Sequence, residues 1–335
     1  MYTRWLTYFA ANALFAFSMS WGQNIDAKVS SGSDSPQAAT SIPKGVILVK
    51  GAWSSASDSV TPLPEDGKIV DNVYRNAYFG IKWALPRDWT EEYTGPPPSD
   101  EGRYVLAQIV PTAAFQGPVR GSVLITADDL FFMPFPGTHG EELIDFTNEH
   151  LQPDYKVERP PAEMTIGGRS FRFFAYWSPA AELHWYVFAT EIRCHAVEVV
   201  LSSSDTKLIQ HLMQDLNAMT FPPEDALAGG GVAPVCMKDY ASGKNILSRI
   251  DPVFSERRSN TVPVRIVIRR DGKVRHIHFL SAFPEQAKAI TDALFQWQFR
   301  PYLQNGNPVE VETGIMFGRT PRPATASPTA GAPTD

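Results

Sequence analysis

The clearest alternation of apolar and polar positions lies in the last third of the chain. Valine and isoleucine fill every second position from residue 264 to residue 268, and Arg265 stands between them. This two-residue period is typical of a strand with one buried face. Asp271–Gly272 tolerates the positive φ angles of a tight turn, and a second alternating run follows at residues 274–280. The pattern predicts a hairpin of two half-buried strands.

A helix and a further strand follow this hairpin. Pro284 suits the first turn of a helix, where its missing N–H costs no hydrogen bond. Four apolar side chains then share one helical face: Ala287, Ile290, Leu294 and Trp297. Residues 305–308 predict a loop, and residues 309–317 predict a last strand. In that strand two glutamates alternate with four other residues: Val309, Val311, Thr313 and Ile315.

Five pieces of sequence occur in a fixed order across this segment. They are an expected helix at Ile246–Leu247 with Asp251-Pro252-Val253-Phe254 after it, the VPVRIVI strand, the DGKV turn, Trp297-x-Phe299-x-Pro301 and the NGNPVEV return strand. Together they resemble the C-terminal domain of the TonB family of energy transducers. The resemblance implies a small domain over residues 244–319, built from a three-stranded antiparallel sheet and two helices.

The same resemblance implies a binding mode. In the TonB family the last strand of this domain accepts an extended peptide of a partner, so the expected contacts are Val309, Val311, Thr313 and Ile315. Main-chain hydrogen bonds would give such a contact its affinity, and the partner would be an envelope or outer-membrane protein. Two alternatives stay open: this edge closes the sheet, or it pairs with a second copy in a homodimer.

Residues 68–223 predict a larger α+β domain. Strands are expected from Tyr78–Ile81 to Trp89, over residues 104–110 and over residues 122–127. Thr138 and Glu141 have the spacing of a capping box before a short helix, and Ser204 or Asp205 begins a final amphipathic helix. Two hairpins are expected between these helices, around Gly167–Gly168 and around Arg193-Cys194-His195. Antiparallel strands with helices fit an α+β sandwich.

This larger segment resembles the PsbP-like family. The residues that carry the resemblance are Tyr-x-Asn-x-Tyr-Phe-Gly-Ile from Tyr74, Leu85-Pro86-x-x-Trp89, the later hairpins and the closing helix. Because that family contains non-enzymatic assembly and binding proteins, the resemblance implies a binding module.

The remaining segments predict export and linkage. A chain of 335 residues is long for one domain, which favours two. Residues 1–22 are typical of a signal peptide with a charged start, a short apolar run and small residues at its end, which predicts a periplasmic or secreted protein. An uncleaved inner-membrane anchor is the alternative. Residues 23–67 predict a flexible lead, 224–243 a linker and 320–335 a disordered tail. An apolar island at residues 42–53 is a candidate extra strand for the domain that follows.

Charge is unevenly distributed between the segments. The net charge of −6 argues against nucleic-acid binding. Residues 24–243 carry 16 Lys and Arg against 28 Asp and Glu, whereas residues 244–319 carry 12 against 7. The basic segment is therefore suited to an acidic partner, and its own neighbour is one candidate.

The chain has two cysteines, Cys194 and Cys236. In an exported protein an even number of cysteines favours pairing, and a bond between these two would tie the linker to the preceding domain. Two free thiols are the alternative.

Catalytic motifs are absent from the sequence. It contains no Walker loop, HExxH, GxSxG or paired-cysteine metal motif. His276-x-His278 lacks a third ligand, so no metal is expected, and neither is a cofactor. Glu182, His184 and Glu191 are better explained by exposed pairing than by acid–base chemistry, and Phe131 to Phe135 by a loop folded over the core.

We therefore expect an exported, non-enzymatic binding protein. A TonB-type energy transducer for outer-membrane transport is the first alternative. Its family anchor carries a histidine and its spacer is rich in proline, but this chain has no histidine before His139 and its 28 prolines are scattered. A hydrolase in residues 68–223 is the second alternative.

Overall fold

The computed structural model describes residues 46–48, 56–58, 64, 67–93, 102–112, 120–133, 139–221, 234–254, 260–280 and 282–318. The predicted signal peptide and the predicted tail lie outside these residues. Among the described residues, no helix combines the length and hydrophobicity that a bilayer crossing needs.

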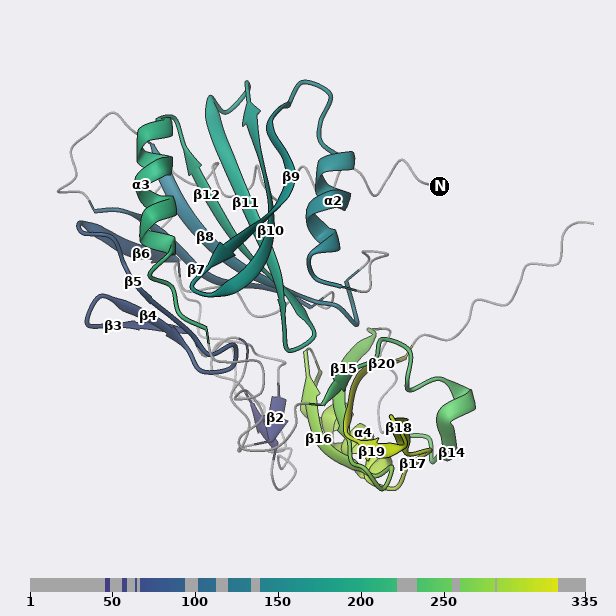
Figure 1. Ribbon diagram of the computed structural model, residues 1–335. Coiled ribbons are helices and arrows are strands. Elements are labelled where there is room, and N and C mark those ends of the chain that lie inside the picture. The colour runs from purple at the N-terminus through teal and green to yellow at the C-terminus, as the bar shows by residue number, and fades with distance from the viewer. Residues whose placement is uncertain are drawn as a thin grey trace, which may run out of the picture.

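Seven antiparallel strands form the larger of two principal sheets (Figure 1). In spatial order they are β6 (Trp89–Tyr93), β7 (Arg103–Pro111), β8 (Gly121–Asp129), β12 (His195–Ser203), β11 (Leu183–Ile192), β10 (Arg169–Ser178) and β9 (Lys156–Ile166). The hairpins predicted around Gly167–Gly168 and Arg193–Cys194 are confirmed as β9–β10 and β11–β12.

Both faces of this seven-stranded sheet are covered. Alternate residues of β10 pack into two different clusters, Phe171 and Phe173 into one and Phe174 and Tyr176 into the other. The first cluster is closed by helix α3 (Thr206–Leu216) and by a three-stranded sheet. The strands of that sheet are β3 (Lys68–Val70), β4 (Val73–Asn76) and β5 (Ile81–Ala84). Helix α2 (Glu142–Glu149) covers the other face, so this part has the predicted α+β arrangement.

The two helix starts differ from each other. Asp205 caps α3 as predicted, because its side chain accepts a hydrogen bond from the backbone N–H of Lys207 at 2.8 Å. The capping box predicted for α2 does not match the observed helix start: the helix begins at Glu142 with Glu141 at the N-cap, not at the third helical position, and Thr138 lies outside the described residues. The Glu141 carboxylate accepts from the backbone N–H of Glu191 at 3.1 Å, a long-range contact that spacing along the chain does not reveal.

A second principal sheet has six strands. In spatial order they are β1 (Val46–Leu48), β2 (Ala56–Asp58), β16 (Val274–Phe279), β15 (Val262–Ile268), β20 (Val311–Phe317) and β13 (Val235–Cys236). Helix α4 (Pro284–Leu294) packs on one face, where Ile290 and Leu294 meet Val264 and Ile266. The predicted hairpin, helix and return strand are therefore present in order.

Three expectations for this part need correction. The residues Ile246–Leu247, expected in a helix, belong to strand β14 (Ile246–Ser248), which pairs with β17 (Gln298–Phe299). A short 3-10 helix, η2 (Gly243–Asn245), precedes β14 along the chain. Val309 belongs to β19 (Asn307–Val309), which pairs with β18 (Tyr302–Gln304). The apolar island does supply a strand, β1, but that strand joins the six-stranded sheet through β2.

Strand β15 is buried along its whole length, not on one face only. Its even-numbered residues belong to the core that α4 covers, whereas Arg265 on the other face contacts Asp129 and the β11–β12 turn of the larger sheet. Arg265 is only 2% exposed for this reason. The alternating pattern was correct about the two faces, but a second layer of protein covers the polar one.

Candidate functional site

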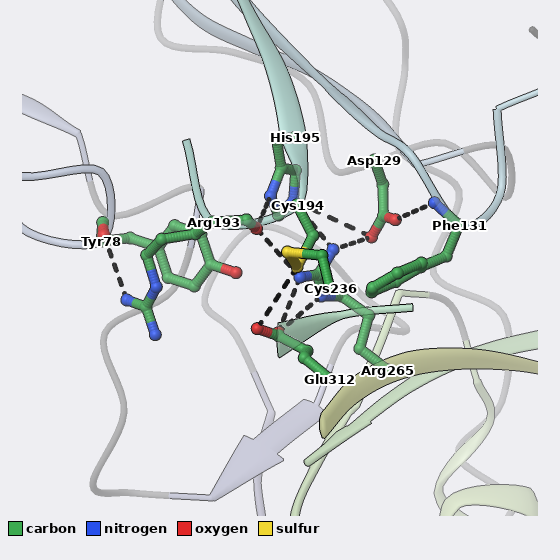
Figure 2. Close-up of polar contacts among 9 residues, drawn as sticks. All are labelled: Tyr78, Asp129, Phe131, Arg193, Cys194, His195, Cys236, Arg265 and Glu312. Carbon is green, nitrogen blue, oxygen red and sulfur yellow. Dashed lines mark hydrogen bonds and ion pairs between the residues drawn. A yellow bond between two sulfur atoms is a disulfide. The ribbon is translucent and has the colours of Figure 1, made fainter. Parts of the chain in front are cut away.

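A buried ion cluster lies where the two principal sheets meet, and Figure 2 shows it. The Arg265 guanidinium donates to an Asp129 carboxylate oxygen at 2.6 Å and to the Glu312 Oε1 atom at 2.6 Å. Asp129 ends β8, whereas Arg265 and Glu312 come from the neighbouring strands β15 and β20. One cation thus bridges two carboxylates from different sheets.

The electrostatic balance of this cluster favours a charged Arg265. Burial alone would lower the pKa of Arg265, but the carboxylates of Asp129 and Glu312 outweigh burial and hold that pKa well above its ordinary value. The Phe131 ring adds a cation–π contact, with its centroid 4.7 Å from the guanidinium carbon.

His195 completes the cluster as a neutral side chain. It is 0% exposed, and burial followed by the positive charge of Arg265 lowers its pKa well below 6.5. Its Nδ1 atom lies 2.8 Å from the carbonyl oxygen of Arg193, and its Nε2 atom lies 3.4 Å from an Arg265 nitrogen. A proton on Nδ1 satisfies both contacts, because that nitrogen then donates and Nε2 accepts.

The β11–β12 turn beside the cluster has an unusual backbone. Arg193 and Cys194 have φ angles of 51° and 60°, a region that L-residues rarely adopt. A two-residue hairpin of this kind needs positive φ at both positions and usually contains glycine. Here Arg193 packs its guanidinium over the Tyr78 ring at 4.2 Å and donates to the Tyr78 carbonyl at 3.1 Å. These contacts help to offset a backbone cost of about 1–3 kcal/mol per residue.

Cys194 and Cys236 form a disulfide across this turn, which confirms the predicted pairing. Cys236 belongs to β13, a two-residue strand that runs parallel to β20. The bond therefore holds a segment of the predicted linker against β20. The Cys194 Sγ atom also lies 3.8 Å from the Glu312 carboxylate, which places the disulfide next to the ion cluster.

The aromatic segment after Asp129 lies between the sheets. Phe132 packs against the larger core and Phe131 against Arg265, which agrees with the prediction of a loop folded over the core for these two residues; Pro134 and Phe135 lie outside the described residues. A Cβ added at Gly314 of β20 would stand 2.6 Å from the Phe131 Cβ atom. Glycine at this position allows the two sheets to approach.

A polar cleft of about 400 Å³ opens beside the disulfide. Its walls are His139, Glu141, Arg169, Ser170, Thr190, Glu191, Arg193, Pro234, Cys236 and Glu312. Burial raises the pKa of the Glu191 carboxyl, which accepts from the backbone N–H of Gly140 at 3.2 Å and lies 3.4 Å from a His139 nitrogen.

A groove of about 370 Å³ runs along the end of β20. It is lined by Gly314 to Gly318 together with Lys238, Asp239, Ala241, Ser242, Arg249 and Trp297. We call the side of β20 that faces away from β15 its outer edge. Strand β13 pairs with this outer edge at Val311 and Glu312, and among the described residues no strand pairs with it beyond that point.

The residues expected on the partner-binding edge are therefore in different environments. Val311 is buried and paired with Val235, and Thr313 is buried. Ile315 is half-exposed and lines the groove. Val309 lies outside β20, in the short β18–β19 hairpin.

The other candidates from the sequence are not brought together. Glu182 pairs with Arg120, His184 with Glu158 and Glu191 with His139, so these three residues form no common site. Within the described ranges, no three His, Cys, Asp or Glu side chains are placed to hold a metal ion.

Sequence reasoning did not identify the ion cluster. Asp129, His195, Arg265 and Glu312 are far apart along the chain, and each has the ordinary composition of a strand face or strand end. The uneven charge distribution pointed toward a contact between the basic and acidic segments, and the Arg265–Asp129 ion pair is one such contact.

Comparison with known proteins finds little. No protein-family model and no curated protein matches the chain. The solution structure of the cyanobacterial PsbP protein CyanoP from Synechocystis is 15% identical, with 45% of this chain and 91% of that chain covered and a TM-score of 0.31. LpqN of Mycobacterium tuberculosis, described as involved in cell envelope biogenesis, is 14% identical, with 43% and 83% covered and a TM-score of 0.29. Similarity at this level assigns neither a family nor a function, and the TonB resemblance stays a prediction.

Proposed function

We propose that this protein is an extracytoplasmic, non-enzymatic binding protein that holds an extended segment of a partner at the outer edge of β20. The main support for the proposal is that only one part of that edge is paired with another strand. Strand β13 occupies it at Val311 and Glu312, whereas Gly314, Ile315 and Met316 are half-exposed along the groove. An exposed strand edge with a groove beside it suits β-strand addition.

The register identifies which backbone groups a partner would meet. Met316 lies opposite Pro263, which has no N–H, and the carbonyl of Pro263 accepts from Leu280 on the other side of β15. Met316 therefore belongs to a non-hydrogen-bonded pair, and its N–H and C=O point to the outer edge. The same parity applies to Gly314, two residues earlier. The two residues offer two donors and two acceptors to an added strand.

The surroundings of the groove favour an acidic segment. Lys238, Arg249 and Asp239 line it; Arg249 also pairs with Asp251 at 2.6 Å and lies over the Trp297 ring. Residues 244–319 carry 12 basic against 7 acidic side chains. Affinity for an acidic partner would fall as salt is raised past the level at which the Debye length is about 8 Å.

The disulfide favours an oxidising compartment. An envelope or outer-membrane protein is the partner class that fits this location and the TonB-like order of elements. Energy transduction would need a membrane anchor. The candidate segment for an anchor is residues 1–22, which lie outside the residues that the structure describes.

The test is capture of a partner from a cell-envelope extract by the full-length protein. Met316→Pro removes an outward N–H and would abolish capture without breaking the pairing of β20 with β15. Leu303→Pro is the matched control, because Leu303 is exposed and faces Pro308 in a non-hydrogen-bonded pair of the β18–β19 hairpin. Equal capture by both folded variants would overturn the proposal.

A further inference from the structure

Strand β13 occupies the outer edge at the point where a longer partner strand would continue. The N–H groups of Val235 and Met237 donate to the carbonyls of Glu310 and Glu312 at 2.8 and 3.0 Å. The pairing is parallel and covers two residues, Val235 opposite Val311 and Cys236 opposite Glu312. A strand this short has little stability of its own.

The disulfide is the strongest link that holds β13 in place. The Cα atoms of Cys194 and Cys236 lie 5.6 Å apart. After β13 the chain is anchored independently, because Met237 packs on the smaller core and Tyr240 is buried within it. Loss of the disulfide would therefore release the residues before Met237 and leave the rest docked.

The two sulfur-bearing residues differ in their access to solvent. Cys194 is 1% exposed, whereas Cys236 is exposed and lines the polar cleft. An attacking thiolate approaches one sulfur and expels the other. Solvent access restricts attack to Cys236 and makes Cys194 the leaving group. The cleft walls carry both signs of charge, Arg169 and Arg193 together with Glu141, Glu191 and Glu312, so solvent access selects Cys236 and electrostatic attraction does not.

We infer that this disulfide is a reducible latch and that Cys236 is its site of thiol–disulfide exchange with an external dithiol. A thiolate of the dithiol bonds to the Cys236 Sγ atom while the Cys194–Cys236 bond breaks, and the electron pair leaves on Cys194, which takes up a proton. The second thiolate of the dithiol then attacks the mixed disulfide, and Cys236 leaves and is protonated. The dithiol ends as a disulfide, and this protein ends with two thiols.

The environment of Cys194 accommodates the reduced state. In the disulfide its sulfur carries no hydrogen, so the 3.8 Å approach to the Glu312 carboxylate is only a contact. A protonated Cys194 thiol would gain a hydrogen-bond acceptor at that oxygen. The other Glu312 oxygen stays bound to Arg265.

Release of β13 would lengthen the open edge from Gly314–Phe317 to Val311–Phe317. The backbone groups of Glu312 would become available beside those of Gly314 and Met316. This consequence rests on the proposed function, because it matters only if the edge binds a partner. The latch itself does not depend on a partner.

Residue-resolved amide hydrogen exchange on the full-length protein tests the latch. The amide of Glu312 faces β13, whereas those of Thr313 and Ile315 face β15, by the alternation of the ladder. After reduction, or in Cys236→Ser, we expect at least a tenfold faster exchange at Glu312 and unchanged exchange at Thr313 and Ile315. Continued protection at Glu312 would overturn the latch, and so would loss of protection at all three amides, which would show that the bond holds the whole sheet.

Glutathione serves as the probe for the site of attack. Brief exposure of the native protein to reduced glutathione, followed by acid quenching and peptide mapping, should give a mixed disulfide at Cys236 only. A mixed disulfide at Cys194, or a bond that reacts only in denaturant, contradicts the assignment.

Partner capture under oxidising and reducing conditions separates the two proposals. Increased capture after reduction supports both. Faster exchange at Glu312 without any capture leaves the latch standing and removes the proposed function.

Discussion

Arg265 shows how strongly one side chain can depend on its partners. It is 2% exposed and bridges Asp129 and Glu312, which are themselves buried. A buried ion cluster adds little net stability compared with apolar packing, but loss of one member leaves its partners as uncompensated charges. Removal of Arg265 is therefore expected to lower stability mainly because it leaves the buried Asp129 and Glu312 carboxylates without a cation.

Replacing Arg265 with methionine keeps much of its volume and removes its charge. We expect the free energy of unfolding to fall by about 3–5 kcal/mol, because two carboxylates lose their cation. Arg275→Met is the control: Arg275 pairs with Glu310 near the surface, and such a pair contributes about 1 kcal/mol or less. Urea denaturation of both variants measures the difference, and equal losses would contradict a buried cluster.

We expect stability to depend on pH because of His195. Its pKa in the folded protein is lowered from 6.5, so the unfolded chain takes up a proton first as pH falls. Stability is then fully present above pH 6.5 and decreases below it, by up to about 1.4 kcal/mol per pH unit for one proton. His195→Asn removes the titrating group. Denaturation at several pH values should show a flatter profile for this variant between pH 6.5 and 5, and parallel profiles would contradict the assignment.

These residues mark the limit of sequence reasoning at this scale. Alternation placed Arg265 opposite Val264 and Ile266, which is correct, but it carried no information on what covers the polar face. The pairing of Cys194 with Cys236 was predictable, because only two cysteines exist and export favours oxidation. The cluster itself was not, because its members lie 136 residues apart at the Arg265–Asp129 bond.

Secondary-structure elements were predictable where turn chemistry and period agreed. The Gly167–Gly168 and Asp271–Gly272 turns, the Asp205 cap and Pro284 all lie at observed element ends. The helix predicted at residues 246–247 is a strand instead, because the strand conformation depends on pairing with β17, about fifty residues away. The pairing of β13 with β20 could not be predicted from the sequence either, because a two-residue strand is too short to show an alternating pattern.

Gly314 gives a test of how the elements pack at the junction. Gly314→Ala would place a Cβ atom 2.6 Å from the Phe131 Cβ atom and 2.9 Å from the Phe132 ring. We expect a loss of about 1–3 kcal/mol from overpacking. Gly243→Ala is the control, because a Cβ there meets nothing within 4 Å. Thermal melting of the two variants checks this, and equal melting temperatures would contradict close packing of the aromatic segment on β20.

At the scale of the whole molecule, several contacts between described residues join the two principal sheets. They include the Arg265 ion cluster, the aromatic segment against Gly314, the disulfide that places β13 on β20, and Leu280, which follows β16 and packs in the core of the larger sheet. Figure 2 shows the disulfide next to the ion cluster, with Phe131 beside Arg265. The groove begins at Gly314, which also packs on Phe131, and extends to Gly318 at the end of β20.

Export is a prediction for the whole chain. We expect the mature protein to begin near Gln23, because the apolar run before it is short and ends in small residues. N-terminal sequencing after expression in a Gram-negative host measures this. A start at Met1 with retention in the membrane would indicate an anchor and would favour a transducer.

The most direct test of the proposed function is amide exchange of the protein with and without its captured partner. We expect slower exchange at Gly314 and Met316, whose N–H groups point to the outer edge, and no change at Ile315, whose N–H is already bonded to β15. Unchanged exchange at Gly314 and Met316 in a saturated complex would show that the partner binds elsewhere.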